Sequence, residues 1–392
     1  MRERHKRVAV GDLCEFVNGN GFRPPDWKPA GLPIIRIQNL NGSRNFNYFD
    51  GEPKQKWIIE PGDLLFAWAG VKGVSFGPTI WSGPRGVLNQ HIFRVVPKSG
   101  VDKYWLFLAL KFATARIESN AHGFKSSLVH VQKDDITNQV VDLPSLPEQR
   151  KIAEILQTWD EAIEKLEALI TQRRNQAAAL RQRIFEADYA SDNRLSRARD
   201  LFETVSEKAR PDLPLLAVMQ DIGIVRRDEL DRRVAMPDGD TSSYKVVRPG
   251  DFVISLRSFE GGLEYSGITG LVSPAYTVLP PTQKIDCSYY RHFFKSRSFV
   301  GRLDRLIFGI RDGKQIAFRD FGDLRIPSPT LDEQSAHAEL MDLLERGISI
   351  ETKRKETLTR QKRGLMQKLL TGEWRVDAAA PSNPAKETTD AR

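Results

Sequence analysis

The chain repeats itself, and this internal duplication limits its possible folds more than any other feature. Three segments of the first half recur in the second half, in the same order and at offsets between 181 and 188 residues. The pairs are LPIIRIQNL from Leu32 with LPLLAVMQD from Leu213, PGDLLFAWAG from Pro61 with PGDFVISLRS from Pro249, and LPSLPEQRKIAEIL from Leu143 with IPSPTLDEQSAHAEL from Ile326. Repetition in a fixed order predicts two tandem copies of one folding unit.

Each copy has the same predicted order, a strand-rich globular part followed by a long helix. Short apolar runs such as LPIIRI, HIFRVV and DFVISL are bounded by Gly, Pro, Asn and Asp, which predicts strands. Aromatic-rich stretches at 104–119 and 289–306 predict shorter helices within the globular parts.

The long helices have the clearest local signals. Ser145 with Glu148, and Thr330 with Glu333, have the spacing of a capping box, and Gly372 supplies a helix stop. Apolar residues then recur at spacings of three, four and seven, which predicts that the two helices pair as an antiparallel coiled coil. The seam residues predicted to bind a partner are Ile152, Leu156, Ile163, Leu166, Ile170, Leu344, Ile348, Leu358, Leu365 and Leu369. The second seam is interrupted by Glu351, Lys355 and Lys362.

These patterns predict an α+β fold with pseudo-twofold internal duplication. The predicted ranges are a globular domain at 1–144, a central helix at 145–190, a second globular domain at 191–329, a distal helix at 330–372 and a disordered tail at 373–392. The tail is assigned because its sequence has no apolar periodicity.

Composition narrows the partners. Lys and Arg outnumber Asp and Glu by 59 to 51, giving a net charge of +8, and this basic excess favours a polyanionic partner such as nucleic acid. Cys14 and Cys287 do not make a disulfide framework. No apolar window approaches the roughly 20 residues of a membrane helix, and the charged N-terminus is not a secretory signal, so we expect a cytoplasmic protein.

Several of these segments resemble one known family, the specificity subunits of type I restriction–modification systems. The run KRGLMQKLLTGEWRV at 362–376 resembles the second helical region of that family, and the helix starts LPSLPEQ and PTLDEQ resemble its helix starts. The segments GDLCEFVNGNGFRP and SYKVVRPGDFVISLRSFEGGLEYSG are also similar, so the resemblance extends from about Gly11 to Val376.

The resemblance implies two target recognition domains, each reading one half of a bipartite, asymmetric sequence in double-stranded DNA. It implies that the helices bind methyltransferase (modification) subunits and set the spacing of the half-sites, and that a restriction/translocase subunit joins this core. S-adenosylmethionine, ATP and magnesium would then belong to the partner subunits, with no cofactor, metal or catalytic residue expected on this chain.

An enzyme acting on DNA is the main rival interpretation. The chain lacks the glycine-rich cofactor loop and the Asn/Asp-Pro-Pro-Tyr motif of an adenine methyltransferase. A nuclease motif can be spelled from Asp26, Glu52 and Lys54, but it has no counterpart in the second copy. The six histidines show no pair at zinc-ligand spacing. A non-catalytic coiled-coil adaptor whose globular domains bind protein instead of DNA stays open as the alternative.

Side chains that pair with base edges are expected in the loops between strands, at equivalent places in both copies. In the first copy the DNA-binding candidates are Arg36, Gln38, Asn39, Lys72, Asn89, Gln90, His91, Lys125, Ser126 and Ser127. In the second copy they are Gln220, Arg257, Ser258, Glu260, Tyr276, Arg311, Lys314 and Gln315.

Overall fold

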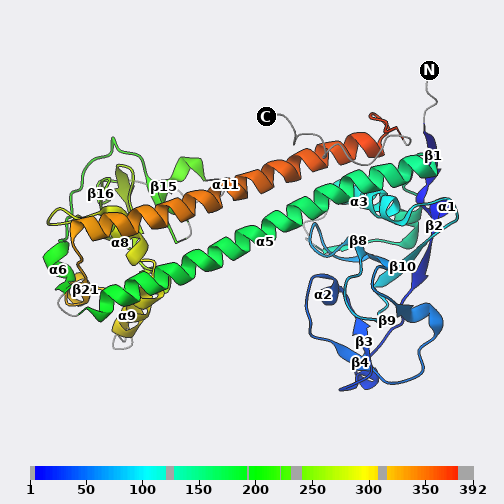
Figure 1. Ribbon diagram of the computed structural model, residues 1–392, viewed down its shortest axis with the longest axis horizontal. Coiled ribbons are helices and arrows are strands. Elements are labelled where there is room, and N and C mark those ends of the chain that lie inside the picture. Colours follow the sequence, from blue (N-terminus) through cyan, green and yellow to red (C-terminus); the bar gives the residue numbers. More distant parts are fainter. Residues whose placement is uncertain are drawn as a thin grey trace, which may run out of the picture. The chain divides into compact units, whose positions relative to one another are not determined.

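The computed structural model describes residues 5–120, 128–191, 194–220, 222–230, 241–307 and 316–377. The chain forms two compact units. Unit 1 combines Met1–Lys165 with Lys355–Arg392, and unit 2 is Leu166–Arg354 (Figure 1). The units differ from the predicted domain ranges because each contains the neighbouring halves of both long helices. No described helix is long and apolar enough to cross a membrane.

Unit 1 is built from small antiparallel and mixed sheets. One sheet has the order β2 (Cys14–Asn18), β10 (Ile92–Pro97), β6 (Leu64–Ala67), β8 (Gly77–Ile80). A second has the order β4 (Asn47–Phe49), β3 (Leu32–Ile35), β9 (Gly86–Leu88), β5 (Ile58–Ile59). Two ribbons pair β1 (Lys6–Ala9) with β12 (Val140–Leu143), and β7 (Ala69–Val71) with β11 (Leu128–His130).

The helices of unit 1 cover these sheets. Its short helices are α1 (Val10–Leu13), α2 (Ile37–Leu40), α4 (Lys133–Thr137) and the 3-10 turns η1 (Pro24–Asp26) and η2 (Gln55–Trp57), and its longer helix is α3 (Lys103–Asn120). Trp105 of α3 is fully buried in one apolar cluster with Phe16, Phe66 and Phe93 of the first sheet. Ile152 and Leu369, from the two long helices, belong to the same cluster, so the helices share the core of the globular part.

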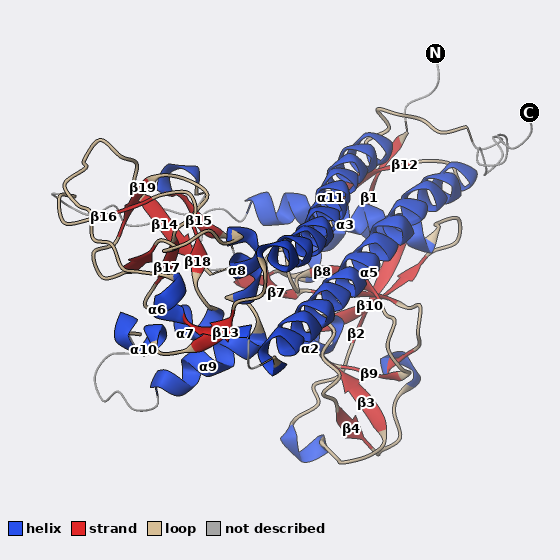
Figure 2. Cartoon of the chain, turned by 60° about the vertical axis from the view of Figure 1, so that its left-hand side comes forward, coloured by secondary structure: helices blue, strands red, loops and turns tan. Residues whose placement is uncertain are grey.

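Unit 2 has the same plan with different sheet details (Figure 2). Its sheets are β18 (Glu264–Tyr265), β17 (Phe252–Ile254), β20 (Thr277–Leu279) in that order, and the pairs β13 (Leu195–Arg197) with β21 (Arg325–Pro327), β14 (Leu216–Met219) with β15 (Gly223–Arg226), and β16 (Lys245–Val247) with β19 (Gly270–Val272). Its helices are α6 (Ala198–Leu201), η4 (Arg227–Glu229), α7 (Ser258–Gly261), α8 (Cys287–Phe293), α9 (Arg297–Ile307) and α10 (Phe318–Gly322). The core is rich in aromatic rings; Phe294 lies 5.0 Å from Phe252 and 4.8 Å from Phe299 between ring centroids.

The duplication is visible in hydrogen bonds as well as in element order. In unit 1 the buried side chain of Gln149 accepts from the backbone N–H of Asp102 (2.8 Å) and donates to the carbonyl of Pro144 (3.0 Å). In unit 2 Gln334 accepts from the N–H of Asp286 (2.9 Å) and donates to the carbonyl of Pro329 (2.8 Å). Each glutamine therefore fastens the start of a long helix to the start of the aromatic-rich helix, which explains why this glutamine recurs in both copies.

The long helices α5 (Leu146–Ala190) and α11 (Leu331–Leu370) lie within two residues of their predicted ranges. Within each unit their local halves run antiparallel, as predicted. In unit 1 Lys362 forms an ion pair with Asp160. In unit 2 Arg181 lies 3.0 Å from Glu345, and Arg173 lies 3.9 Å from Glu351. Lys362 and Glu351, which interrupt the apolar seam, thus pair with residues of opposite charge on the other long helix.

The seam residues require one correction. Ile152, Leu156, Leu166, Ile170 and Leu369 are buried within their own unit, and Ile163, Leu344, Ile348, Leu358 and Leu365 are partly buried. A heptad stripe reports that a helix has a partner without saying which one. Ile152, Leu156 and Leu369 belong to the apolar cluster of unit 1, so these buried members are not available to bind a modification subunit.

The two predicted capping boxes differ. At α11 the box is confirmed, because Glu333 Oε2 accepts from the N–H of Thr330 (3.0 Å) and the Glu333 N–H donates to the Thr330 hydroxyl (3.4 Å). At α5 the prediction was wrong. The Glu148 carboxylate accepts instead from Arg375 Nε (2.7 Å) and Nη2 (2.9 Å) and lies 3.1 Å from His5 Nε2.

The predicted start of the disordered tail, at residue 373, is too early. Arg375 binds Glu148, Lys368 donates to Glu373 at 2.9 Å, and Val376 packs against the apolar cluster of unit 1. Gly372, with a φ of +68°, lets the chain turn after α11, as its sequence position predicted. Residues 378–392 of the predicted tail lie outside the described residues.

This arrangement predicts a pH dependence for unit 1. Burial alone would raise the pKa of Glu148, but the hydrogen bonds and charges of Arg375 and His5 outweigh it and hold the pKa below its ordinary value of 4.5. A lowered folded-state pKa means that the carboxylate stabilises unit 1 above the unfolded pKa, and that this contribution is lost as the pH falls through the folded value. We expect the urea concentration at the unfolding midpoint to decrease when the pH is lowered from 5.5 to 3.5. This decrease should be smaller in Arg375→Met.

Tryptophan fluorescence measures this effect in unit 1 alone. All seven tryptophans, Trp27, Trp57, Trp68, Trp81, Trp105, Trp159 and Trp374, belong to unit 1. An equal pH dependence in the parent chain and in Arg375→Met would contradict the assignment of Glu148.

Candidate nucleic-acid interface

In unit 1 the pairing of strands brings several predicted DNA-binding loops to one edge. β3 and β9 run parallel with Ile35 opposite Leu88, so Arg36 and Asn89 follow side by side, and the Asn89 N–H donates to the Ile35 carbonyl at 3.0 Å. β6 and β10 run antiparallel with Ala67 opposite Ile92. Trp68 and His91 therefore extend from the same end of that ladder.

Two of the predicted residues in the loop after β3 have structural contacts. Arg36 Nη2 donates to Asn47 Oδ1 at 2.5 Å, and its guanidinium carbon lies 5.0 Å from the centre of the Trp27 ring. Asn39 is only 4% exposed; its Oδ1 accepts from the Arg36 N–H and its Nδ2 donates to the carbonyls of Ser43 and Asn45, all at 3.0 Å. The prediction for Asn39 as a base contact is therefore corrected, because its amide shapes the loop.

The remaining candidates of unit 1 lie nearer to solvent. Gln38 and Gln90 are exposed, and Asn89 and His91 are partly exposed. Lys72 is exposed, and its ammonium donates to the Glu118 carbonyl at 2.8 Å. Three further candidates, Lys125, Ser126 and Ser127, lie outside the described residues.

His130 joins this edge although the sequence analysis did not select it as a binding residue. It ends β11, and β11 pairs with β7 so that His130 lies opposite Ala69, next to Trp68. The Trp68 ring lies 4.8 Å from the His130 ring and 5.2 Å from the His91 ring. The sequence had no signal for this contact, because the pairing joins residues about 60 positions apart.

Unit 2 gathers its own candidates at the corresponding strand ends. β17 and β20 pair with Ile254 opposite Thr277, which brings the loop after β17 close to Tyr276. Gln220, after β14, donates from Nε2 to the Arg257 carbonyl at 2.9 Å. Arg257 and Glu260 are exposed. The structure thus brings Gln220 and Arg257 together, as an interface requires.

Two candidates of unit 2 have structural roles. Ser258 is fully buried, and its hydroxyl accepts from the Ser255 N–H at 2.8 Å, so its prediction as a DNA contact is corrected. Tyr276 is partly buried against the apolar cluster around Val247 and Val278. Arg311, Lys314 and Gln315 lie outside the described residues.

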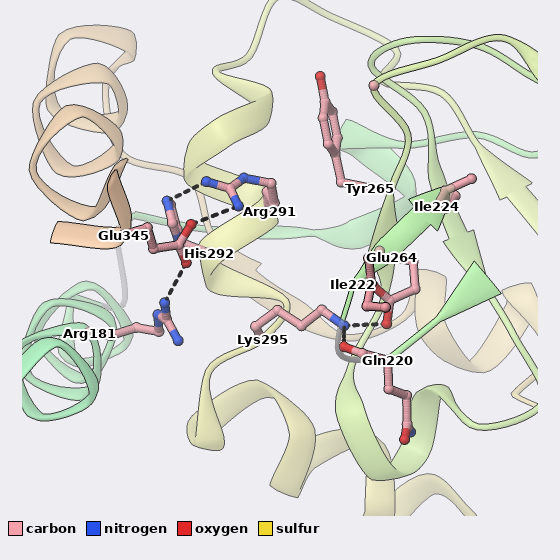
Figure 3. A pocket seen from close by; sticks show the side chains of 12 residues that line it. Arg181, Gln220, Ile222, Ile224, Glu264, Tyr265, Arg291, His292, Lys295 and Glu345 are labelled. Atoms are coloured by element: carbon pink, nitrogen blue, oxygen red, sulfur yellow. Dashed lines mark hydrogen bonds and ion pairs between the residues drawn. The ribbon is translucent and has the colours of Figure 1, made fainter. Parts of the chain in front are cut away.

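A pocket of about 720 Å³ lies beside this edge of unit 2 (Figure 3). It collects charged side chains from α5, β18, α8, α11 and the turn after α8, and each Lys and Arg in it faces a carboxylate. Lys295 pairs with the buried Glu264, while Arg291 Nη1 and Arg181 Nη2 lie 2.9 and 3.0 Å from the two oxygens of Glu345. Because these charges are paired, the pocket does not form a free anion site.

The titratable groups at this pocket do not assemble a hydrolase site. Ser288 donates to Asp342 (2.9 Å), and His292 Nε2 also lies against Asp342 (2.7 Å), so the hydroxyl faces the carboxylate and not the imidazole. Burial lowers the pKa of His292, although Asp342 opposes that shift. Serine nucleophiles need the base within hydrogen-bond reach.

A metal is equally poorly placed there. In the described parts of the chain, His292, Asp342 and Glu345 are the group with metal-ligand spacing. Arg291 lies 2.6 Å from Asp342 and 2.9 Å from Glu345, so a guanidinium already neutralises both carboxylates. The arrangement is a structural ion-pair network that holds α8 to α11.

Comparison with known proteins agrees with the duplicated fold. Residues 3–172 match the type I restriction modification DNA specificity domain. The specificity subunit of the type I restriction enzyme MjaVIII from Methanocaldococcus jannaschii is 26% identical over 407 residues, covering 94% of this chain and 92% of that protein.

Two solved structures have a similar fold at low identity. The type I restriction–modification S subunit from M. genitalium has a TM-score of 0.56 at 15% identity, with 94% of this chain and 97% of that chain covered. A second structure comes from work on the structural basis of complex assembly and conformational transition in the type I restriction–modification system. One of its chains has a TM-score of 0.59 at 16% identity, with 95% of this chain and 99% of that chain covered.

Proposed function

We propose, from the premise that this chain belongs to the type I restriction–modification specificity subunits, that it reads DNA sequence for a restriction–modification complex. Each unit reads one half of a bipartite, asymmetric target in double-stranded DNA. The relatives are named as specificity subunits, and the duplicated fold supplies two reading edges on one chain.

One observation carries this proposal. The glutamine that fastens the start of each long helix is the same in both copies, Gln149 and Gln334, whereas the residues at the strand ends differ. Trp68 in unit 1 corresponds to Leu256 in unit 2, and Ala69 corresponds to Arg257. A shared scaffold with different polar loops is what two half-sites of different sequence require.

The chemistry of the complex would reside in other subunits. S-adenosylmethionine, ATP and magnesium would be bound by the modification and restriction/translocase subunits, and this chain would act without a cofactor, metal or catalytic residue of its own. The net charge of +8 favours phosphate contacts that position the units on DNA. We place the complex in the cytoplasm, where its DNA substrate lies.

Selection from a random duplex library tests the proposal. The full chain, bound to its modification subunit, should enrich a sequence with two specified halves and an unspecified spacer. We expect Arg257→Ala to relax specificity in one half only, by a factor corresponding to about 1–3 kcal/mol, because Arg257 is exposed at the reading edge of unit 2. No enrichment would favour the adaptor interpretation, and an unchanged preference in Arg257→Ala would remove that residue from the interface.

The modification subunit must use a surface other than the buried seam. On α11 Leu343 is 61% exposed and Ile350 is 65% exposed, one heptad apart on a face away from the buried Ala338 and Met341. Large apolar side chains on an exposed helix face are typical of a docking surface. We expect Leu343→Glu/Ile350→Glu to weaken copurification of the modification subunit at least tenfold, by analogy with the loss of about 1.5 kcal/mol per buried leucine.

The control for that surface is a charge change on the same helix. Ser349→Glu, also exposed, adds a carboxylate without removing an apolar side chain. Full copurification of the double variant would exclude this face as the docking site.

A further inference from the structure

Three aromatic rings from separate strand ends form a compact group in unit 1. Trp68 follows β6, His91 precedes β10, and His130 ends β11. The Trp68 ring lies between the two imidazoles, 5.2 Å from His91 and 4.8 Å from His130 by ring centroids. We call this group the Trp68–His91–His130 cluster.

The indole at the centre is held in place. Its Nε1 donates to the Gln90 carbonyl at 3.1 Å, and its ring lies 6.1 Å from the buried Phe93. The Trp68 backbone carbonyl accepts from the Val131 N–H at 3.1 Å, which holds the end of β11 next to the backbone of Trp68. The indole donor is therefore already used, and Trp68 acts as a rigid platform for the two histidines.

The imidazoles, in contrast, retain their hydrogen-bonding capacity. His130 is exposed and His91 is partly exposed, and neither ring nitrogen has a hydrogen-bond partner within the described residues. A neutral imidazole offers one N–H donor and one acceptor. Among the described residues no third metal ligand lies with these two imidazoles, and two imidazoles alone do not complete a zinc site.

We propose that the Trp68–His91–His130 cluster reads a purine in the half-site of unit 1, with an imidazole N–H donating to the purine N7. This inference rests on the proposed function and names the chemistry of one of its two reading edges. N7 is an acceptor that both purines display in the major groove, where a protein donor can reach it. Because the platform is fixed before DNA binds, little conformational freedom is lost when the contact forms.

Within the described part of unit 2, no equivalent group is found. The residue that corresponds to Trp68 is Leu256, which is 49% exposed and offers no hydrogen bond. A cluster confined to unit 1 fits a contact to one half-site and not a feature of the common scaffold.

Replacing N7 by carbon tests the contact from the DNA side. After a target has been selected from the random library, each purine of the half-site read by unit 1 is changed in turn to its 7-deaza form, and affinity is measured with the full chain bound to its modification subunit. We expect one position at which the 7-deaza purine weakens binding by about three- to tenfold, the range of one hydrogen bond.

The protein variants complete the cycle. On the natural duplex, the affinity of His91→Ala/His130→Ala should be lower than that of the parent chain by the same factor. On the 7-deaza duplex, the variant and the parent chain should bind with equal affinity. Leu256→Ala, at the corresponding position of unit 2, should retain the full 7-deaza penalty. The inference is overturned if no 7-deaza position weakens binding by the parent chain. It is also overturned if the histidine variant binds more weakly than the parent chain by the same factor on both duplexes. Absence of any bipartite target at the selection step would instead overturn the proposed function, and this inference with it.

Discussion

Replacing Gln149 by leucine is expected to destabilise unit 1 by about 3 kcal/mol. Gln149 is 1% exposed, and its amide satisfies the Asp102 N–H and the carbonyls of Pro144 and, at 3.3 Å, Gly100. Leucine fills nearly the same volume but leaves these backbone groups without their partner. An unsatisfied buried polar group costs about 1–3 kcal/mol, so the lost partners and not the lost volume dominate the effect.

Urea unfolding followed by tryptophan fluorescence measures this loss, because the tryptophans belong to unit 1. Gln334→Leu makes the same change in unit 2 and should leave the fluorescence midpoint nearly unchanged. Gln361→Leu, at an exposed position of unit 1, controls for the gain of an apolar side chain. A midpoint for Gln149→Leu equal to that of Gln361→Leu would show that the amide contacts contribute little.

Lys295→Met is expected to destabilise unit 2 by about 3 kcal/mol, because it removes the ammonium that forms an ion pair with the buried carboxylate of Glu264. Lys295 also donates to the carbonyls of Gly261 (3.1 Å) and Gln220 (3.3 Å), so the loss includes the anchoring of the loop that carries Gln220. Figure 3 shows Lys295 extending toward Glu264 and Gln220.

The double variant Lys295→Met/Glu264→Met separates charge from packing. Replacing both members of a buried ion pair by apolar residues is often close to neutral, so the double variant should recover most of the lost stability. Amide hydrogen exchange of β17 and β18 reports on unit 2, and the tryptophan transition should stay unchanged as an internal control. A double variant no more stable than Lys295→Met would mean that the lost carbonyl contacts, and not the lost ion pair with Glu264, cause the destabilisation.

The features that the sequence predicted correctly are local or repeated. The heptad stripes predicted the helices α5 and α11, because a helical period of apolar residues is fixed by the backbone geometry. Thr330 with Glu333, and Gly372, marked helix ends for the same reason, since a cap involves residues only a few positions apart. The duplication needed only the comparison of the chain with itself.

The candidate interface was predicted less well, because a loop sequence does not state which polar side chains turn inward. Asn39 and Ser258 have the residue types of DNA contacts, yet both are buried and bind the backbone of their own loops. His130 reached the edge of unit 1 only through the pairing of β11 with β7. Such outcomes depend on strand register between distant segments, which no local pattern encodes.

The sequence by itself therefore determined that this chain has two copies of one unit, each with a strand-rich part and a long helix that pairs with another. Only the tertiary structure determined which side chains hold each unit together and which are exposed and able to bind a partner. Glu148 shows the difference. Its spacing from Ser145 suggested a local cap, but the fold brought Arg375 and His5 to it from the two ends of the chain. The charged guanidinium of Arg375 and the imidazole of His5, both at close range, provide stronger hydrogen bonds than the single backbone N–H of Ser145 would, so the long-range contact prevailed.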